Sequence, residues 1–499
     1  MHPTTRSATL HVVAALAVSA GAHAALTFLA RNPVPGGSLD NSRLIGTQED
    51  GSPANRFDGF GSGIAFTGVP NFYLFISDRG PNAGNWSAAV DNTTSYRGRA
   101  QTVNITLTAT ANPDVYTLGA DNTNTTLFRR EDNANFIGLS SAFIGANPTQ
   151  NLRLDPEAVC VGPDGSIFIS DEYGPNVYRF DRTGKRIRAY ALPPKFLIAN
   201  PNPRGNLELP PGNTSGRQAN RGLEGLAITP DGARLYGLMQ NALIQDGALN
   251  ASNGRIGLNN RVLEIDVATG ATREFVYVLN AASNGCNELL AVNATQFISI
   301  ERDGAGGTAA RFKRLYLIDT TGATDVSGIP SLPTSGLPAG VTPVAKTLLA
   351  DFINGAGIEP ASFGRFQAAL TQTTTFDRFP EKLEGLAFGP LTADGRRTIL
   401  VSTDNDFVSG FNEVWAFALD ASDLPGYVPQ QFPVGYAFPV APCAGDVTGD
   451  RVCDFADLNA VLTNFGQSGP AMGTGDLTRD GAVNFGDLNA VLTSFGSAC

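Results

Sequence analysis

A short block recurs along the first 420 or so residues, and it constrains the fold more than any other feature of the chain. Each copy joins one strand-like segment, centred on Glu or Gly, to a second segment that ends in polar or acidic residues. The first segments begin at Gly61, Glu157, Glu224, Glu288 and Glu384, and the second segments end at 77–80, 170–172, 240–241, 301–303 and 404–406. Carboxylates at matching positions of a repeat predict blades that aim acids at a shared centre, which is a candidate cation site.

A second pattern lies between these blocks: an alternating strand, then Asp, then a Thr-Gly turn. It ends at Asp181, Asp266 and Asp319, and Asp420 has the same place in a fourth copy. Period-two alternation bounded by such turns is typical of strands in hairpins. Each unit therefore predicts four strands, and four-stranded sheets repeated radially make a β-propeller.

The number of blades follows from the number of units. Five units are visible, about 65 to 95 residues apart, and a sixth is expected between Gln101 and Phe143. We therefore expect an all-β fold, a six-bladed propeller over residues 25–420. The alternative is a non-circular array of β-sandwiches, since a long β-rich chain without helical periodicity is compatible with that architecture too.

Composition supports a turn-rich extracellular β protein. The chain has 499 residues with 56 Gly and 31 Pro, and only 16% of its residues are charged. The net charge of −11 argues against nucleic acid or an anionic membrane surface as a partner, and it is compatible with bound divalent cations.

The first 24 residues resemble a secretory signal. Arg6 supplies a positive charge, residues 12–20 form a short apolar core, and Ala22-His23-Ala24 fits a small-x-small cleavage site. The apolar run is too short to span a bilayer, and no later stretch is long enough. The protein is therefore expected to be secreted, the alternative being a buried helix at the start of the fold.

Secretion would remove every histidine, since His2, His11 and His23 all lie in this segment. The mature protein would then have no Ser-His-Asp triad, no Cys-His pair and no His-ligated zinc. Any chemistry must use acids, Lys, Arg, Tyr, Ser or a metal held by oxygen.

Five cysteines remain, and in an oxidising compartment they are able to pair. Cys443 and Cys499 bracket the C-terminal region and are expected to join its two ends. Cys160 and Cys286 each sit beside a repeated Glu and either bridge or stay buried thiols, and Cys453 is left over.

The C-terminal region contains two copies of a calcium-loop pattern about thirty residues apart. Residues 421–442, rich in Pro, Gly and aromatics, precede it as a linker or closing strand. Positions 1, 3, 5, 9 and 12 of the loops are Asp446, Thr448, Asp450, Asp454 and Asp457, then Asp476, Thr478, Asp480, Asn484 and Asp487. This spacing of oxygen donors is typical of calcium loops. After the first loop, Leu458, Val461, Leu462 and Phe465 have helical spacing and predict one apolar face.

The paired loops and helices over 443–499 resemble a dockerin module, which implies folding by Ca²⁺ and docking onto a cohesin-like partner. Two features depart from that pattern. Arg451 replaces the turn glycine of the first loop, which weakens the expected first site. Phe455-Ala456 and Phe485-Gly486 stand where recognition hydroxyls are common, so another partner is plausible.

Residues from about Leu39 to Asp420 resemble the phytase-like family described as esterase-like activity of phytase. The motifs that carry the resemblance are Ser77-Asp78-Arg79-Gly80, Asp155-Pro156-Glu157-Ala158, Ser170-Asp171-Glu172-Tyr173, Arg221-Gly222-Leu223-Glu224-Gly225, Glu301-Arg302-Asp303 and Lys382-Leu383-Glu384-Gly385. The resemblance implies a calcium-dependent hydrolase of phosphate or other esters.

The residue types fit that chemistry, because acids hold hard cations and fixed cations bind phosphate. The expected catalytic residues are Glu157, Glu224, Glu384, Asp78, Arg79, Arg221, Arg302 and Lys382. The expected calcium ligands in the propeller are Asp171, Glu172, Glu301, Asp303, Asp404 and Asp406. A structural salt-bridge ring is the competing interpretation of the same residues. The competing functions are a lactonase, a glycosidase in polysaccharide breakdown, and a non-catalytic binding propeller.

Overall fold

The computed structural model describes residues 26–82, 93–143, 150–371, 379–408, 410–440, 445–448, 452–468, 475–478 and 480–496. The expected signal segment and its histidines lie outside these residues, as do Asp450, Arg451, Cys443 and Cys499. The expected Cys443–Cys499 pairing thus lies outside the described residues too.

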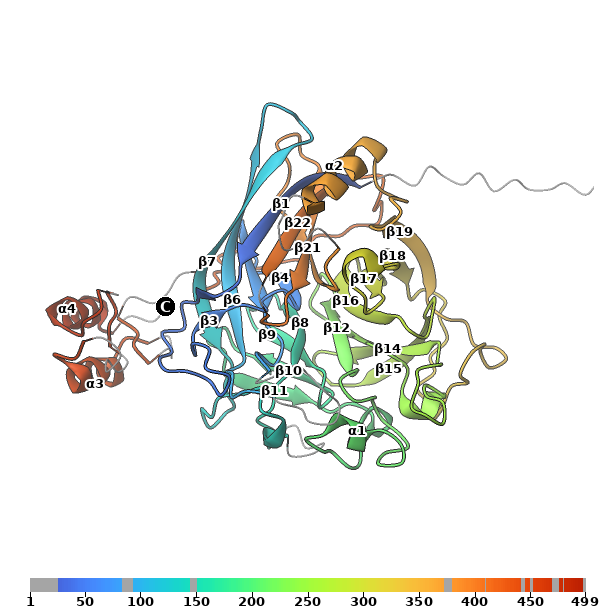
Figure 1. The fold of residues 1–499 in the computed structure, drawn as a ribbon, viewed down its shortest axis with the longest axis horizontal. Helices are drawn as coiled ribbons and strands as arrows, with labels where there is room; N and C mark the ends of the chain where they lie inside the picture. Colours follow the sequence, from blue (N-terminus) through green and yellow to red (C-terminus); the bar gives the residue numbers. More distant parts are fainter. Residues whose placement is uncertain are drawn as a thin grey trace, which may run out of the picture.

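Five four-stranded antiparallel sheets are arranged around a common centre and form a β-propeller (Figure 1). The innermost strands are β4, β8, β12, β16 and β20, and each contacts the next one in sequence. Strand β20 also contacts β4, so the inner strands form a closed ring. Closure of this kind protects the edges of the sheets.

The first three blades each use four strands that are consecutive in the chain. Blade 1 contains β4 (Gly63–Phe66), β5 (Phe72–Ile76), β6 (Arg99–Ala109) and β7 (Tyr116–Leu127). Blade 2 contains β8 (Pro156–Val161), β9 (Ile167–Asp171), β10 (Asn176–Phe180) and β11 (Arg186–Tyr190). Blade 3 contains β12 (Leu223–Ile228), β13 (Arg234–Met239), β14 (Asn259–Asp266) and β15 (Thr272–Val278).

The fourth blade also uses four consecutive strands, whereas the fifth combines strands from both ends of the propeller sequence. Blade 4 contains β16 (Gly285–Ala291), β17 (Gln296–Arg302), β18 (Lys313–Asp319) and β19 (Ala345–Asp351). Blade 5 contains β20 (Lys382–Gly389), β21 (Arg397–Asp404), β22 (Phe411–Leu419) and β1 (Thr27–Pro35). Strand β1 pairs antiparallel with β22 from Thr27–Ala418 to Pro35–Phe411 and so closes the ring.

The expectation of a sixth blade between Gln101 and Phe143 is wrong. That segment forms β6 and β7, which pair with each other and with β5 as the outer half of blade 1. These strands have 11 and 12 residues, whereas the other outer strands have 5 to 9, and in the sequence the long pair looks like a separate unit. The closing strand is β1, and not the segment after β22.

Apolar clusters between neighbouring blades hold the ring together. Trp415 and Phe417 of blade 5, for example, pack with Ile300 and Leu315 of blade 4. Similar clusters lie between each of the other neighbouring pairs of blades. The predicted Asp-Thr-Gly turns join the outer strands: Asp181 Oδ1 accepts a hydrogen bond of 2.8 Å from the Thr183 amide, and Gly184 has a φ of +83°.

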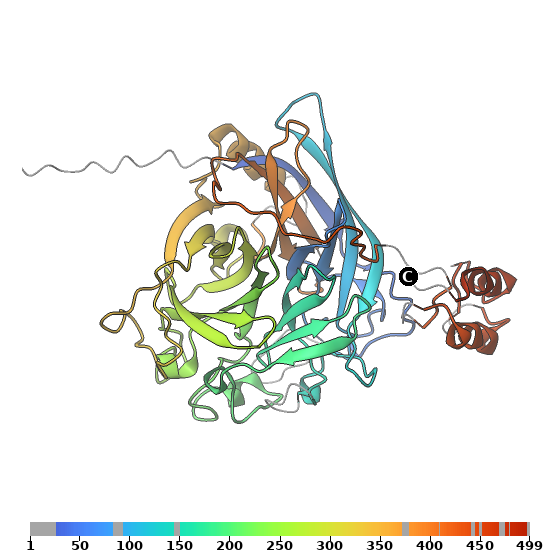
Figure 2. The same cartoon turned by 180° about the vertical axis from the view of Figure 1, so that it is seen from behind.

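The segment after β22 crosses one end of the propeller (Figure 2). The Val428 amide donates to the carbonyl of Val292, which directly follows β16. The Gln431 amide donates to the carbonyl of Pro230, which lies after β12. Tyr436 Oη donates to the Thr67 carbonyl, at the end of β4, over 2.6 Å. The expected linker is therefore fixed against several blades.

Two short helices follow, α3 (Phe455–Asn464) and α4 (Phe485–Ser494), each with a capping box at its start. Val461 and Val491 are buried between them with Cys453. Leu462 and Phe465 were expected on the apolar face, but they are 51% and 39% exposed. The reason is that Phe465 packs edge-on against Phe485 at the module surface rather than into its core.

The remaining elements lie around the propeller. They are α1 (Gly205–Glu208), α2 (Pro360–Thr371), the short strands β2 (Ser38–Leu39) and β3 (Arg56–Phe57), and the 3₁₀ turns Ser140–Ala142, Pro194–Phe196, Ile244–Asp246 and Gly307–Ala309. Cys160, Cys286 and Cys453 are buried free thiols. Among the described residues, none of the helices has the length and apolar character needed to span a bilayer.

Candidate functional site

The repeated acids lie in a ring at one end of the propeller, because the inner strands bulge there. The register of β8 shifts between Pro156 and Ala158, and that of β12 shifts between Leu223 and Gly225. A bulge turns the extra residue out of the regular pattern, here Glu157 and Glu224. Strand β20 bulges in the same way at Glu384.

Blade 4 departs from the predicted pattern by one residue. The bulge of β16 lies between Cys286 and Leu289, and the side chain that meets Glu224 is Asn287. Glu288 occupies the place that Gly225 has in blade 3. Its Oε1 accepts the backbone amides of Leu226 and Leu289 instead of reaching the ring. The sequence repeat therefore predicted the fourth ring acid at Glu288, one residue after the ring position that Asn287 occupies.

Gly225 shows why the acids are followed by small residues. A Cβ atom at Gly225 would lie 2.3 Å from the Asn287 carbonyl oxygen of the neighbouring inner strand. Only glycine allows this approach without a backbone shift. The Glu-Gly pair is thus a packing requirement of the ring as well as a source of carboxylates.

A polar cavity of about 270 Å³ opens above the ring. Its charged lining comes from all five blades or the loops between them and mixes both signs. The lining side chains are Arg79, Glu157, Glu172, Asn220, Arg221, Glu224, Gln240, Arg255, Ser283, Arg302, Glu381, Lys382 and Glu384. Seven of the eight predicted catalytic residues are in this set, and the eighth, Asp78, is 3.9 Å from Lys382 Nζ.

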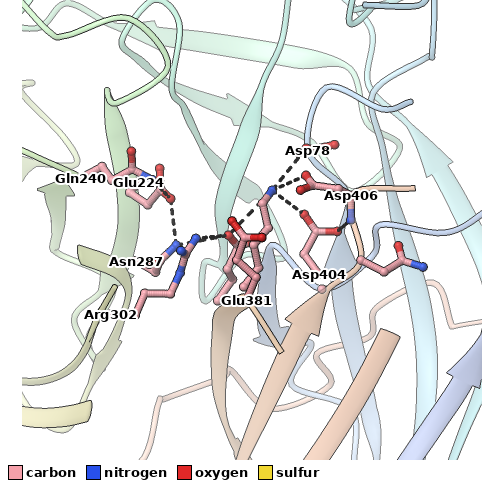
Figure 3. Close-up of polar contacts among 12 residues, drawn as sticks. Asp78, Glu224, Gln240, Asn287, Arg302, Glu381, Asp404 and Asp406 are labelled. Atoms are coloured by element: carbon pink, nitrogen blue, oxygen red, sulfur yellow. Dashed lines mark hydrogen bonds and ion pairs between the residues drawn. The ribbon is translucent and has the colours of Figure 1, made fainter. Parts of the chain in front are cut away.

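Glu224 is held by two amides at the floor of the cavity. Its Oε1 accepts from Gln240 Nε2 at 2.8 Å and from Asn287 Nδ2 at 2.9 Å (Figure 3). Its Oε2 is buried and has no hydrogen-bond partner. Burial, and then the charges of Glu172 and Glu384, raise the pKa of Glu224 well above the usual range. A carboxyl of this kind is suited to proton transfer.

Asn287 links Glu224 to the next carboxylate, Glu384, which Arg302 also holds. Arg302 Nη2 donates to Glu384 Oε1 at 2.8 Å, and Asn287 Nδ2 approaches the same oxygen at 3.4 Å. Glu384 Oε2 is left without a partner. Ring members of three blades are therefore connected through one amide and one guanidinium.

Arg221 and Arg255 face the cavity with amide partners alone. Arg221 Nη1 donates to Gln240 Oε1 at 2.8 Å, and Arg255 Nη1 donates to Asn241 Oδ1 at 3.3 Å. Neither has a carboxylate within 4.0 Å among the described residues. Burial, together with Arg221 and Arg302, lowers the pKa of Arg255 to about 10. Sequence reasoning missed Arg255, because it lies in an irregular loop outside the repeat.

Three of the acids at one side of the cavity surround a lysine. Lys382 Nζ lies 2.5 Å from Asp406 Oδ1, 3.0 Å from Asp404 Oδ2 and 3.9 Å from Asp78 Oδ2. The three carboxylates point toward this common centre (Figure 3). Burial raises the pKa of Asp78 to about 6, whereas its neighbours Arg79 and Lys382 oppose that shift. The expected calcium ligands Asp404 and Asp406 thus serve as ion-pair partners of Lys382.

A second trio of acids, Asp155, Glu157 and Glu172, lies on the other side. Arg79 Nη1 is 3.3 Å from Asp155 Oδ2, and the Arg79 amide donates to Asp155 Oδ1 at 2.9 Å. Burial and the charge of Asp155 raise the pKa of Glu172 to about 7. Asp155 was part of a quoted motif but not of the predicted ligand set.

Three other predicted ligands do not line the cavity. Asp171 accepts from the backbone amides of Asp155, Tyr173 and Gly174, so it shapes the loop after β9. Glu301 pairs with Lys346 at 2.5 Å, and Asp303 pairs with Lys313 at 2.9 Å. The polar ends of the second strands therefore divide into structural and cavity-facing residues, a division that the sequence pattern does not contain.

The acids at the end of the two C-terminal loops have matching roles. Asp457 Oδ1 accepts from the Val447 and Thr448 amides at 2.7 and 2.8 Å, and Asp487 Oδ1 accepts from the Thr478 amide at 2.8 Å. Gly481 has a φ of +87°, as a turn glycine requires. The described residues of both loops thus have the same local geometry.

The sequence profile of the family described as esterase-like activity of phytase matches residues 55–407, which is more than two thirds of the chain. An uncharacterised secreted protein of Arthroderma benhamiae is 30% identical over 195 residues, 33% of this chain and 37% of that protein. The matched part of the chain thus spans little more than a third of that relative.

The solved structures to which the chain is similar share little sequence with it. A gluconolactonase of Xanthomonas campestris is 12% identical, with a TM-score of 0.27, over 78% of this chain and 97% of that one. A streptogramin B lyase is 11% identical, with a TM-score of 0.26, over 73% and 94%.

Proposed function

The chain belongs to the family described as esterase-like activity of phytase, and from this membership we propose that it is a secreted hydrolase of phosphate esters. The cavity above the Glu ring is the proposed active site. Secretion is proposed from the N-terminal segment, and the relative from Arthroderma benhamiae is described as secreted.

The observation that carries the proposal is the pair of arginines without carboxylate partners. Arg221 and Arg255 face the cavity near Arg302, and among the described residues they bond only to amide side chains. Buried cations that repel one another are costly unless an anion joins them. The planar fork of a guanidinium fits two phosphate oxygens, so this group of arginines favours a phosphate-bearing substrate.

Glu224 is the proposed general base. Gln240 and Asn287 orient one carboxylate oxygen and leave the buried Oε2 without a hydrogen-bond partner. Oε2 takes a proton from a water whose oxygen bonds to phosphorus, and the bond from phosphorus to the alcohol oxygen breaks. The alcohol leaves with a proton from solvent, while Arg302 and the two other arginines stabilise the charge on the phosphoryl oxygens.

The other predicted catalytic residues have supporting roles in this proposal. Glu384 positions Arg302, and Lys382 neutralises Asp78 and its two neighbours. Glu157 belongs to the second trio of acids, and Arg79 pairs with Asp155 of that trio. Each of them shapes the charge of the cavity without touching the proposed reacting atoms.

We also propose that residues 443–499 form a dockerin-like module that binds Ca²⁺ through the two loops and docks onto a cohesin-like partner. The support is the repetition of its geometry. The two helices have the same capping box, and Phe455–Phe495 and Phe465–Phe485 both pack with ring centroids 5.0 Å apart at 77°.

The test is phosphate release from phytate and from nitrophenyl phosphate by the full chain. We expect Glu224→Gln to lower kcat by about 10²- to 10⁴-fold, the usual worth of a general base. Arg255→Met should mainly raise KM. The matched controls are Glu288→Gln, a buried acid outside the cavity, and the half-exposed Arg273→Met. Inertness on both phosphates, or sugar or lactone turnover in their place, would refute the proposal.

A further inference from the structure

Two clusters of three carboxylates stand out in the described part of the chain. In each, one oxygen from every residue lies within 4.8 Å of the others. The first contains Asp78, Asp404 and Asp406, and we call it the lysine-filled cluster. The second contains Asp155, Glu157 and Glu172, and we call it the open triad.

The lysine-filled cluster already holds a cation. Lys382 Nζ approaches all three of its carboxylates, two of them at 3.0 Å or less. An ammonium group has three donors and satisfies three such acceptors. No further ion is needed there.

The open triad has no cation at its centre. Arg79 lies outside it and, of its three acids, pairs only with Asp155, at 3.3 Å, while also lying 3.6 Å from Asp78 of the lysine-filled cluster. Neither Glu157 nor Glu172 has an ion pair within 4.0 Å among the residues that the structure describes. Glu172 is 2% exposed, and its buried Oε1 has no hydrogen-bond partner. A buried, unpartnered carboxylate oxygen beside two other acids is costly unless a ligand completes it.

We infer that the open triad binds one calcium ion. Its three carboxylates have one guanidinium within 4.0 Å, that of Arg79, which Asp78 shares, and a divalent cation offsets the remaining excess of negative charge. The ligands are all hard oxygens, and their separations of up to 4.8 Å match two calcium–oxygen bonds of about 2.4 Å. The inference goes beyond the proposed reaction and does not depend on it.

Terbium, a luminescent substitute for calcium, tests this inference. Residues 443–499 contain neither Tyr nor Trp, so emission excited through tyrosine reports on ions in the propeller and not on the C-terminal loops. Tyr173 directly follows Glu172 and is buried. We expect the full chain to show tyrosine-sensitised terbium emission that calcium displaces.

The variants locate the ion. Glu172→Gln should reduce the emission to background, whereas Asp406→Asn in the lysine-filled cluster should preserve it. Tyr173→Phe removes the sensitiser and keeps every ligand, so it should also lose emission, which settles the matter if Glu172→Gln fails to fold. Absence of emission from the unaltered chain overturns the inference. Emission that persists in both Glu172→Gln and Tyr173→Phe also overturns it. If Glu172→Gln does not fold, emission that persists in Tyr173→Phe is enough to do so.

Discussion

The lysine-filled cluster and the open triad have the same number of acids, but only the first has a side-chain cation at its centre. In the first, Lys382 from the start of β20 enters between carboxylates of blades 1 and 5. In the second, Arg79 reaches only the edge of the group, at Asp155. The difference shows that a group of acids near a propeller axis is not by itself a metal site. What decides is whether the chain supplies its own cation.

The largest effect is expected from removing that cation with Lys382→Met. The buried Asp404 and the partly exposed Asp406 would then lose their cation, and Asp78 would keep only Arg79, at 3.6 Å. Breaking a buried ion pair costs about 3 to 5 kcal/mol. Chemical denaturation should show a loss of this size. Calcium should restore part of it, because the variant cluster would resemble the open triad. An unchanged free energy of unfolding would show that Lys382 does not neutralise the cluster.

A second effect concerns the pH dependence of stability. The pKa of Asp78 is raised from 3.8 to about 6, mainly by burial, so the native state binds this proton more tightly than the unfolded chain. The resulting stability is fully present below pH 3.8 and is lost as pH rises through about 6. Asp78→Asn should remove this loss, and it should gain up to about 3 kcal/mol over the unaltered chain by pH 7.

Unfolding curves recorded at several pH values check this expectation. The difference between Asp78→Asn and the unaltered chain should be small at pH 4 and should grow toward pH 7. A constant difference across this range would argue that Asp78 does not titrate abnormally.

Calcium should stabilise the propeller through the open triad. At a calcium concentration one hundred times the Kd, binding adds about 2.7 kcal/mol to the free energy of unfolding. Glu172→Gln should lose this calcium-dependent increment, while Asp406→Asn should retain it. The C-terminal loops are unchanged in both variants, so their contribution cancels. Equal increments in the two variants would remove the distinction between the clusters.

The smallest effect is expected at Glu288, a lone buried acid beside neither cluster. Burial raises its pKa well above the usual range, which favours the neutral carboxyl. An amide has nearly the same shape and keeps the acceptor oxygen for the Leu226 and Leu289 amides. Glu288→Gln should therefore change stability by less than about 0.5 kcal/mol, in contrast to every cluster variant. A larger loss would mean that Glu288 is ionised.

The sequence pattern predicted the ring and most of the cavity, because both depend on the repeat. Glu157, Glu224 and Glu384 precede small residues at the start of inner strands, and that arrangement is local. Asn287 was missed because a bulge shifts the register of β16 by one residue, which alternation alone does not reveal. Arg255 was missed because its loop has no counterpart in other blades.

The pairing of charges was beyond prediction for another reason. Lys382 and Asp78 lie in different blades and meet only when the ring closes. Arg79 and Asp155 also come from different blades, and they meet where blade 1 packs against blade 2. Which acids gain a cation, and which remain open, is therefore a property of the closed propeller. The predicted number of blades was wrong for a similar reason, because only the strand pairing shows that β6 and β7 belong to blade 1.

The most direct test is a crystal of the unaltered protein grown with calcium and measured where calcium scatters anomalously. A peak is expected about 2.3 to 2.6 Å from carboxylate oxygens of Asp155, Glu157 and Glu172, with no peak among Asp78, Asp404 and Asp406. A peak in the lysine-filled cluster, or a propeller without any peak, would contradict the account.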